Sequence, residues 1–365
     1  MRYLIITSEF PPGPGGIGKH SYCLAKALVH NGITVDVVCN MDYVTNTEIN
    51  SFIKSLPNRL KIYRINRNGI LTYVHRVKTI FRLYKKHQYD KVLVSGQFSL
   101  WIGAWLKKHF TNDTKVEAFI HGSELYLGGK IKHWLTHQSL KALDKLYPVS
   151  GYTAKQLAIV DGKKVRIVPN GLDFAEWNAT NKAFTLRWDG YPKLLTVGSI
   201  SDRKGQQNVI LALPQLLKSY PRIHYHIVGK TGDTTYLIAL IKKLGVQKHV
   251  TIHGVFSETD LRSAYKSVDI LCLLSEHTND GDFEGFGISV LEANVMGLPA
   301  IGSKNSGIED AIRHGYNGYL VDAHNTDDIK QAIDRILESD RMNTRQQCIS
   351  WANRFNWNSI VKDIL

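Results

Sequence analysis

Short apolar runs alternate with amphipathic helical patterns along almost the whole chain, and this alternation constrains the fold more than any other sequence feature. The first run, 2–7, is followed by a helical pattern over 17–30 and a second apolar run over 34–39. Strands that alternate with helices predict a mostly parallel sheet covered by helices on both faces. Further strand-like runs in the first half are 60–65, 91–95, 116–121, 145–150 and 165–168.

The alternation stops after Pro169-Asn170-Gly171 and restarts at Lys193, and residues 172–192 show no clear period. We therefore expect a linker over 171–192, flanked by domains over 1–170 and 193–349. An aromatic tail over about 350–365 is expected to pack back on the first domain. The predicted fold class is α/β, with two Rossmann-like, doubly wound domains that face each other across a cleft. Strand-like runs in the second half are 193–199, 223–229, 250–254, 269–274, 300–303 and 319–321.

The composition narrows the class of protein. A chain of 365 residues is long enough for about two domains. No apolar run reaches the roughly 18 residues that a membrane span needs, and the apolar start at 3–6 is too short for a secretory signal. The cysteines are scattered, which argues against a disulfide framework or a cysteine zinc site and fits a reducing cytoplasm. They are Cys23, Cys39, Cys272 and Cys348.

Positive charge is concentrated in the first half. The net charge is +14, and residues 1–150, with 21 Lys and Arg against 9 Asp and Glu, carry +12 of it. This asymmetry indicates that one half meets an anionic partner: phospholipid, nucleic acid or a phosphorylated substrate. Residues 59–91 hold ten basic side chains and one acidic one, with apolar residues at helical spacing. This segment is either a core-facing helix with a solvated basic side or an interfacial helix on anionic lipid.

Candidate chemistry is expected in loops that follow strands, because open α/β sheets bind ligands beyond the carboxyl ends of their strands. The loop at 9–18 is rich in glycine and precedes a helix whose free N–H groups suit a phosphate. Gly13, Gly15 and Gly18 match a dinucleotide fingerprint, but several residues separate them from the strand, and Asp36 lies within the second strand. A nicotinamide-dependent oxidoreductase and a loop without a ligand both remain open.

Two further loops carry ionisable side chains. His121 directly follows a strand, where it can reach a binding site or be a hydrogen-bonded structural histidine. Arg203 and Lys204 follow the first strand of the second half. A planar guanidinium beside a mobile ammonium can hold a diphosphate, although the pair can also be solvated surface charge.

A fourth loop contains two carboxylates eight residues apart, Glu284 and Glu292. If a helix starts near Gly287, Glu284 lies in the loop and Glu292 on the helix, where both can accept hydrogen bonds from hydroxyls of a sugar and a ribose. The simpler interpretation is that these carboxylates only place negative charge at the start of a helix and bind no ligand. Asp280 and Asp282 have the spacing of a metal-binding pair, but no third ligand is evident, so we predict a solvated loop and no metal site.

The order and spacing of these motifs over most of the chain resemble the retaining glycosyltransferases of family 4, which have the GT-B fold. In many relatives an arginine follows the glycine at the position of Gly198. Here that residue is Ser199, and Arg203 would supply the second cation. The motifs that carry the resemblance are Ser8-Glu-Phe-Pro-Pro with Gly15-Gly-Ile-Gly18, His121-Gly-Ser-Glu124, Val168-Pro-Asn-Gly171, Phe283-Glu-Gly-Phe-Gly287 through Glu292, Gly297-Leu-Pro-Ala300, Gly307-Ile-Glu309 and Gly315-Tyr-Asn-Gly318.

The resemblance implies a donor-binding role for the fourth loop. Glu284 would bind hydroxyls of the donor sugar, and Glu292 would accept a hydrogen bond from the ribose. Gly285, Phe286 and Gly287 would lie against the sugar and the diphosphate, mainly through their backbone.

The resemblance also implies roles for the other loops. Arg203 and Lys204 would neutralise the leaving diphosphate. Gly15 and Gly16 would close over the phosphates from the other domain, and His121 would line the reacting centre.

The resemblance further implies a retaining, metal-independent hexosyltransferase whose nucleotide-sugar donor is a co-substrate, with no other cofactor. Residues 1–170 would bind the acceptor and 193–349 the donor. The polar insert at 279–283 resembles the mannosyltransferase-like branch, so GDP-mannose is the favoured donor, with UDP-glucose and UDP-N-acetylglucosamine (UDP-GlcNAc) as alternatives.

The expected acceptor is a glycan or a lipid-linked molecule in bacterial cell-surface polysaccharide or glycolipid synthesis. The enzyme would be cytoplasmic and peripheral on the inner face of the cell membrane, which residues 59–91 would contact. A basic nucleic-acid-binding protein is a further alternative, but the sequence has no recognisable binding module, and we expect no nucleic acid partner.

Overall fold

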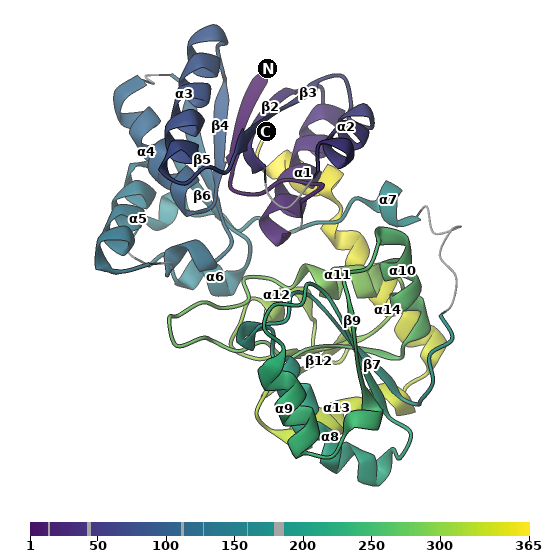
Figure 1. Ribbon diagram of the computed structural model, residues 1–365. Coiled ribbons are helices and arrows are strands. Elements are labelled where there is room, and N and C mark those ends of the chain that lie inside the picture. Colours follow the sequence, from purple (N-terminus) through teal and green to yellow (C-terminus); the bar gives the residue numbers. More distant parts are fainter. Residues whose placement is uncertain (14, 42–44, 111–112, 127, 159, 179–185) are drawn as a thin grey trace. The chain divides into compact units, whose positions relative to one another are not determined.

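The computed structural model describes residues 1–13, 15–41, 45–110, 113–126, 128–158, 160–178 and 186–365. The chain divides into two compact units (Figure 1). Unit 1 consists of Met1–Gly171 and Trp357–Leu365, and unit 2 of Leu172–Asn356. Among the described residues, no helix is both long enough and apolar enough to cross a membrane.

Unit 1 is built on a six-stranded sheet in which all neighbouring strands pair in parallel, in the order β3-β2-β1-β4-β5-β6. This is the doubly wound order, whose connections reverse direction between β1 and β4. The strands are β1 (Arg2–Thr7), β2 (Thr34–Met41), β3 (Leu60–Asn66), β4 (Lys91–Ser95), β5 (Lys115–Ile120) and β6 (Lys145–Pro148).

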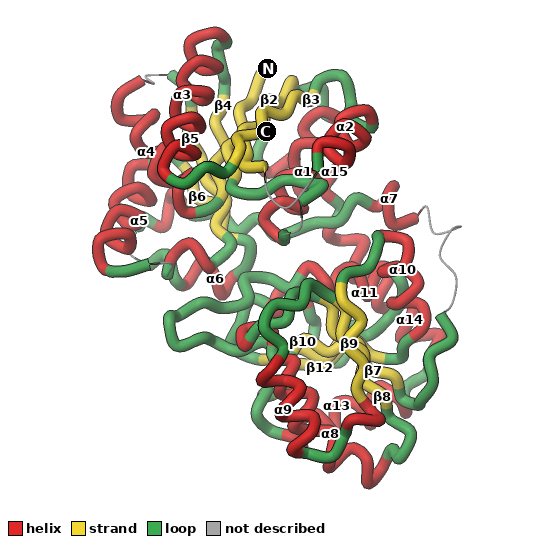
Figure 2. The backbone as a smooth tube through the Cα atoms, in the orientation of Figure 1, coloured by secondary structure: helices red, strands yellow, loops and turns green. Residues whose placement is uncertain are grey.

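Helices cover both faces of this sheet (Figure 2). Leu4 and Ile6 of β1, both fully buried, belong to a core that includes Ile80 of α3, Leu106 of α4 and Leu140 of α5. A strand buried on both faces needs apolar residues at successive positions, which explains its continuous apolar run. The helices are α1 (Gly16–His30), α2 (Asn46–Lys54), α3 (Ile70–Lys86), α4 (Gln97–Phe110), α5 (Lys130–Ala142), α6 (Gly151–Lys155) and α15 (Trp357–Ile360).

Unit 2 has a second parallel sheet with the same doubly wound order, β12-β11-β10-β7-β8-β9. Its connections reverse direction between the neighbouring strands β7 and β10, so the loops that follow these two strands lie side by side. The strands are β7 (Lys193–Val197), β8 (His224–Val228), β9 (Val250–Gly254), β10 (Ile270–Leu273), β11 (Ala300–Ser303) and β12 (Gly318–Val321). The helices are α7 (Phe174–Asn178), α8 (Gln206–Ser219), α9 (Thr235–Lys243), α10 (Glu258–Ser267), α11 (Ile288–Val295), α12 (Ile308–Ala311), α13 (Thr326–Glu338) and α14 (Arg341–Ala352).

The structure differs from the sequence prediction over 165–168, where only Val165 forms an isolated bridge to Leu146. The segment runs beside β6, and Val168 donates to the carbonyl of Pro148. Pro148 has no N–H to donate in return, so the ladder cannot continue. Within the predicted linker 171–192, α7 forms part of unit 2, and residues 179–185 lie outside the described residues.

The last residues of the chain complete unit 1. The ring of Trp357 lies 4.9 Å from that of His20 on α1. Lys91 of β4 donates to the carbonyl of Ile364, and the side chains of Arg166 and Asp363 form an ion pair at 2.6 Å. The predicted aromatic tail over about 350–365 is therefore divided between the two units. Its residues up to Asn356 belong to unit 2, and Trp357–Leu365 belong to unit 1.

Candidate active site

The loop after β7 positions the two cations. It ends in a short 3-10 helix, Asp202–Lys204, which Gly205 closes in the left-handed conformation with φ of 70°. A Cβ atom at Gly205 would lie 1.7 Å from the carbonyl oxygen of Leu274, directly after β10. Only glycine allows this approach, which holds the loops after β7 and β10 together.

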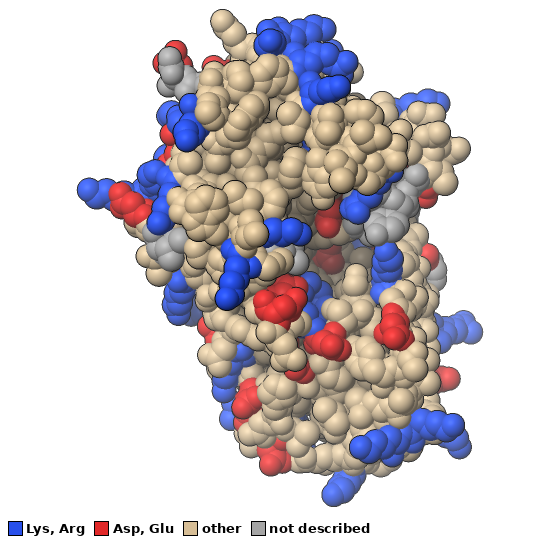
Figure 3. All heavy atoms as spheres, turned by 60° about the vertical axis from the view of Figure 1, so that its left-hand side comes forward, with Lys and Arg blue, Asp and Glu red and all other residues tan. Residues whose placement is uncertain are grey.

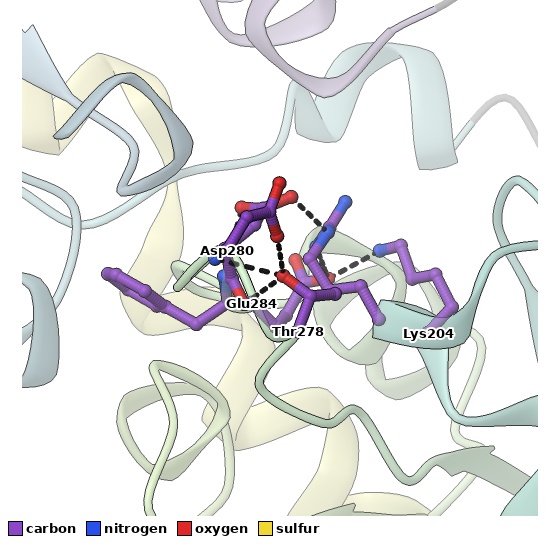
Figure 4. A network of polar contacts seen from close by, with 7 residues as sticks. Lys204, Thr278, Asp280 and Glu284 are labelled. Atoms are coloured by element: carbon purple, nitrogen blue, oxygen red, sulfur yellow. Dashed lines mark hydrogen bonds and ion pairs between the residues drawn. The ribbon is translucent and has the colours of Figure 1, made fainter. Parts of the chain in front are cut away.

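Glu284, in the loop after β10, lies between the two cations. Its Oε2 atom accepts hydrogen bonds from Nη1 of Arg203 and Nζ of Lys204, each at 2.6 Å (Figure 4). Burial alone would raise the pKa of Glu284, but the charges of Lys204 and Arg203 outweigh it and lower the pKa to about 2. The carboxylate therefore stays charged at neutral pH. Its attraction in turn raises the pKa of Arg203.

Asp282 is the second carboxylate that contacts Arg203, with Oδ2 3.1 Å from Nε. Its backbone N–H donates to the hydroxyl of Thr278 at 3.0 Å, and this hydroxyl donates to Asp280 (Figure 4). Asp282 thus forms an ion pair with Arg203, and Asp280 accepts a hydrogen bond from Thr278 within the loop. Among the described residues, no group of three or more His, Cys, Asp and Glu side chains is placed to hold a metal ion.

The glycine-rich segment after Glu284 is fixed through its backbone. The carbonyl of Glu284 accepts a hydrogen bond from the N–H of Gly307 at 2.8 Å. The ring of Phe286 is buried and packs on Phe355, with 5.8 Å between ring centroids. Gly287, with φ of 87°, is the N-cap residue that precedes α11. The Phe286 ring points into the core, and Gly285 and Gly287 have no side chain. Residues 285–287 can therefore contact a ligand only through their backbone groups.

Glu292 lies on α11 and contacts Tyr265 of α10, whose hydroxyl donates to Oε2 at 2.9 Å. Burial and the nearby Glu292 charge raise the pKa of Tyr265 well above its ordinary value, so the hydroxyl keeps its proton. The structure thus joins Glu284 to Arg203 and Lys204, and holds Glu292 through a separate contact. Sequence reasoning did not find Tyr265, because no motif signals a helix residue that contacts another helix.

In unit 1, His121 lies directly after β5, and its Nε2 atom is 2.9 Å from the hydroxyl of Ser95 at the end of β4. Its backbone N–H donates to Glu124 at 2.7 Å. The ring of His20 on α1 lies 4.7 Å from that of His121. Burial, and secondarily His20, lower the pKa of His121 well below its ordinary value, so the ring is neutral at pH 7. Ser95 and His20 were not predicted.

Gly15 and Gly16 lie at the amino end of α1. Gly15 has φ of 143°, and a Cβ atom there would lie 1.9 Å from a carboxylate oxygen of Glu9. Gly16 is the first residue of the helix, and among the described residues beyond its chain neighbours and its own helix backbone, no heavy atom lies within 4 Å of a Cβ placed there. The amino end of α1 is thus built from two glycines, and helix amino ends favour anions.

Two parallel, doubly wound sheets in separate units define a two-domain α/β protein, and unit 2 bears a buried carboxylate and two cations beyond its strand ends. Protein-family models agree with this class. The model described as Glycosyltransferase Family 4 matches residues 14–176, and the one described as Glycosyl transferases group 1 matches residues 178–355. The chain therefore belongs to the family 4 glycosyltransferases with the GT-B fold.

The chain is also similar to individual proteins. An uncharacterised glycosyltransferase of Methanocaldococcus jannaschii is 26% identical, over 100% of this chain and 96% of its own. A GDP-mannose-dependent α-(1-6)-phosphatidylinositol monomannoside mannosyltransferase of Mycobacterium tuberculosis is 26% identical, over 92% and 89%. The sucrose-phosphate synthase of Thermosynechococcus elongatus has a similar structure, with a TM-score of 0.80, 18% identity and coverage of 100% and 97%.

Proposed function

We propose that this glycosyltransferase moves a hexose from a nucleoside diphosphate sugar to a glycan or lipid-linked acceptor, in the synthesis of a cell-surface polysaccharide or glycolipid. The observation that carries the proposal is the buried Glu284 carboxylate, bound by Arg203 and Lys204 beside the point where the unit 2 sheet reverses direction. Cleavage of a sugar–phosphate bond builds negative charge on the leaving diphosphate. Fixed cations stabilise that charge without reorganising.

The individual roles follow from this chemistry. Arg203 and Lys204 would stabilise the leaving group, while Glu284 would accept hydrogen bonds from hydroxyls of the sugar. Glu292, held by Tyr265, would accept a hydrogen bond from the ribose. In unit 1, the neutral His121 would line the reacting centre.

GDP-mannose is the proposed donor, because relatives at 26% identity include GDP-mannose-dependent mannosyltransferases. A ligand that binds only the folded state stabilises it by about 2.7 kcal/mol at 100 times its dissociation constant. We expect GDP-mannose to raise the melting temperature by several degrees in a thermal-shift panel. Free mannose, the control, should have no effect. Stabilisation by UDP-glucose or UDP-GlcNAc alone would exclude GDP-mannose, and no effect of any donor would contradict the proposed function.

We also propose that transfer retains the anomeric configuration, as the resemblance to retaining family 4 enzymes implies. We propose that it needs no divalent metal, because Arg203 and Lys204 provide the positive charge beside the diphosphate. Turnover is therefore expected to be unchanged in EDTA, and the product of an α-linked donor is expected to be α-linked by NMR. Loss of turnover that magnesium restores would contradict the first expectation, and a β-linked product the second.

The basic segment 59–91 has a divided role in the structure. Arg76 is buried and donates to the carbonyl of Thr7 and to the hydroxyl of Ser99, and Lys91 pairs with Glu117 at 2.9 Å. Arg76 and Lys91 therefore hold elements of unit 1 together and do not face a partner. The exposed ones on α3 line a shallow groove whose floor is apolar, formed by Val77, Lys78, Phe81, Arg82, Lys85 and Lys86.

Aromatic side chains of α4 extend this surface. Trp105 and Phe110 are about 40% exposed and lie within 6 Å of Phe81 between ring centroids. Figure 3 shows Lys and Arg gathered at the top of that view, beside a broad area with few charges. Cations around exposed aromatic rings suit the interface of an anionic membrane. We therefore propose that the α3–α4 surface rests on the inner face of the cell membrane.

We expect the protein to co-sediment with vesicles that contain phosphatidylglycerol at low salt. Replacing the four exposed cations of α3 with glutamine should abolish co-sedimentation, because each contributes about 1 kcal/mol near an anionic surface. The matched control replaces four exposed lysines of unit 2, Lys218, Lys242, Lys243 and Lys248. No binding of the unmodified protein, or equal losses in the two variants, would contradict the membrane proposal.

A further inference from the structure

The cluster that would bind the donor diphosphate is electrically balanced. Arg203 and Lys204 contribute two positive charges, and Glu284 and Asp282 contribute two negative ones, with contact distances between 2.6 and 3.1 Å. Figure 4 shows the side chains of Lys204 and Glu284 turned toward one another from the two loops. An incoming diphosphate therefore meets cations that already form ion pairs. It can form its own hydrogen-bonded ion pairs with both cations only if a carboxylate moves away from them.

Glu284 is the less mobile of the two carboxylates. Both cations bind its Oε2 atom at 2.6 Å, its side chain is 11% exposed, and its carbonyl is bonded to Gly307. Separating a buried carboxylate from two cations costs several kcal/mol. Glu284 is also the residue that the proposed function assigns to the sugar hydroxyls, so it must stay in place when the donor binds.

Asp282 makes the weaker contact. Its Oδ2 atom lies 3.1 Å from Nε of Arg203, its Oδ1 atom accepts a hydrogen bond from the backbone N–H of Phe283 at 2.9 Å, and its side chain is 25% exposed. Partly exposed ion pairs contribute little to stability, because water can replace either partner. The Nε of Arg203 is thus the donor group that a diphosphate can take over at the lowest cost.

We propose that Asp282 is a counter-charge for Arg203 that the diphosphate displaces, so that Asp282 positions Arg203 in the unliganded site and limits the affinity for the nucleoside diphosphate product. This inference rests on the proposed function. After transfer, the carboxylate competes with the product for Arg203 and promotes its release. Release of product limits turnover in many enzymes, so such a competitor benefits catalysis.

Calorimetric titration of the full chain with GDP and with UDP tests the proposal. Asp282→Asn keeps the size of the side chain and removes its charge, and Asp282→Ser is a second variant. We expect both to bind the preferred nucleotide about three- to tenfold more tightly than the unmodified protein, with stronger product inhibition. Asp280→Asn is the matched control, because Asp280 lies in the same loop and contacts Thr278. It should leave the affinity unchanged.

Equal or weaker binding in both Asp282 variants, with normal binding by the unmodified protein, would overturn this inference alone. Equal tightening by Asp280→Asn would overturn it too, because the effect would then reflect the net charge of the loop. If the unmodified protein bound neither nucleotide, the proposed function would fail together with the inference.

Discussion

Replacing Lys204 with alanine is expected to lower kcat/KM for sugar transfer by about 10²–10³-fold. Loss of one preorganised group that stabilises developing charge has an effect of about this size in other enzymes. Lys204 is poorly exposed and its Nζ lies 2.6 Å from Glu284, so water cannot substitute for its fixed position. Steady-state kinetics with a saturating acceptor would measure the effect. Lys204→Arg should recover part of the activity, because it restores the charge with a different shape.

The control for this experiment is Lys248→Ala, which removes an exposed lysine from the same unit. Activity should be unchanged in this variant. If Lys204→Ala lost no more activity than Lys248→Ala, the cation would not act on the leaving group, and the assignment of this cluster as the donor site would be wrong.

Gly307→Ala is expected to disturb both the stability of unit 2 and the reaction. A Cβ atom at Gly307 would lie 1.9 Å from the carbonyl oxygen of Gly285 and 2.8 Å from the backbone nitrogen of Phe286. The backbone must therefore move apart, and the hydrogen bond from Gly307 to Glu284 would be lost. Forced overpacking costs about 1–3 kcal/mol of unfolding free energy. Because Glu284 would shift with its backbone, transfer should fall at least about tenfold, even at temperatures where the variant is folded.

Gly232→Ala is the matched control, since the nearest heavy atom to a Cβ there is 4.0 Å away. Its melting temperature and activity should stay close to those of the unmodified protein. Full activity and an unchanged melting temperature in Gly307→Ala would show that the contact between the two backbone segments is not needed to hold Glu284.

The fold could be predicted well from the sequence, because it depends on patterns that many residues share. The alternation of apolar runs with helical patterns predicted two doubly wound units, and the two parallel sheets confirm this fold class. The resemblance to family 4 glycosyltransferases is confirmed by the two family models. The predicted strand at 165–168 was wrong, because one proline on a neighbouring strand decided its pairing.

The site could be predicted only in part. Arg203, Lys204 and Glu284 lie in loops that follow strands, so the sequence places them at one edge of the sheet. Because β7 and β10 are neighbours in that sheet, their loops come together. Which atoms meet depends on side-chain packing, which spacing along the chain does not encode. Asp282 was expected in a solvated loop, yet it pairs with Arg203. The catalytic roles themselves stay predictions.

The division of the chain also sets an order for folding during synthesis. Unit 1 is completed by Trp357–Leu365, which follow the whole of unit 2 in the sequence. During synthesis, most of unit 1 is therefore translated before unit 2, but unit 1 cannot be completed until unit 2 has been translated. Until that segment is released, the surface of α1 around His20 lacks the ring of Trp357, and Lys91 lacks the Ile364 carbonyl. The half of the protein that is translated first thus depends for its completion on a segment that is translated after unit 2.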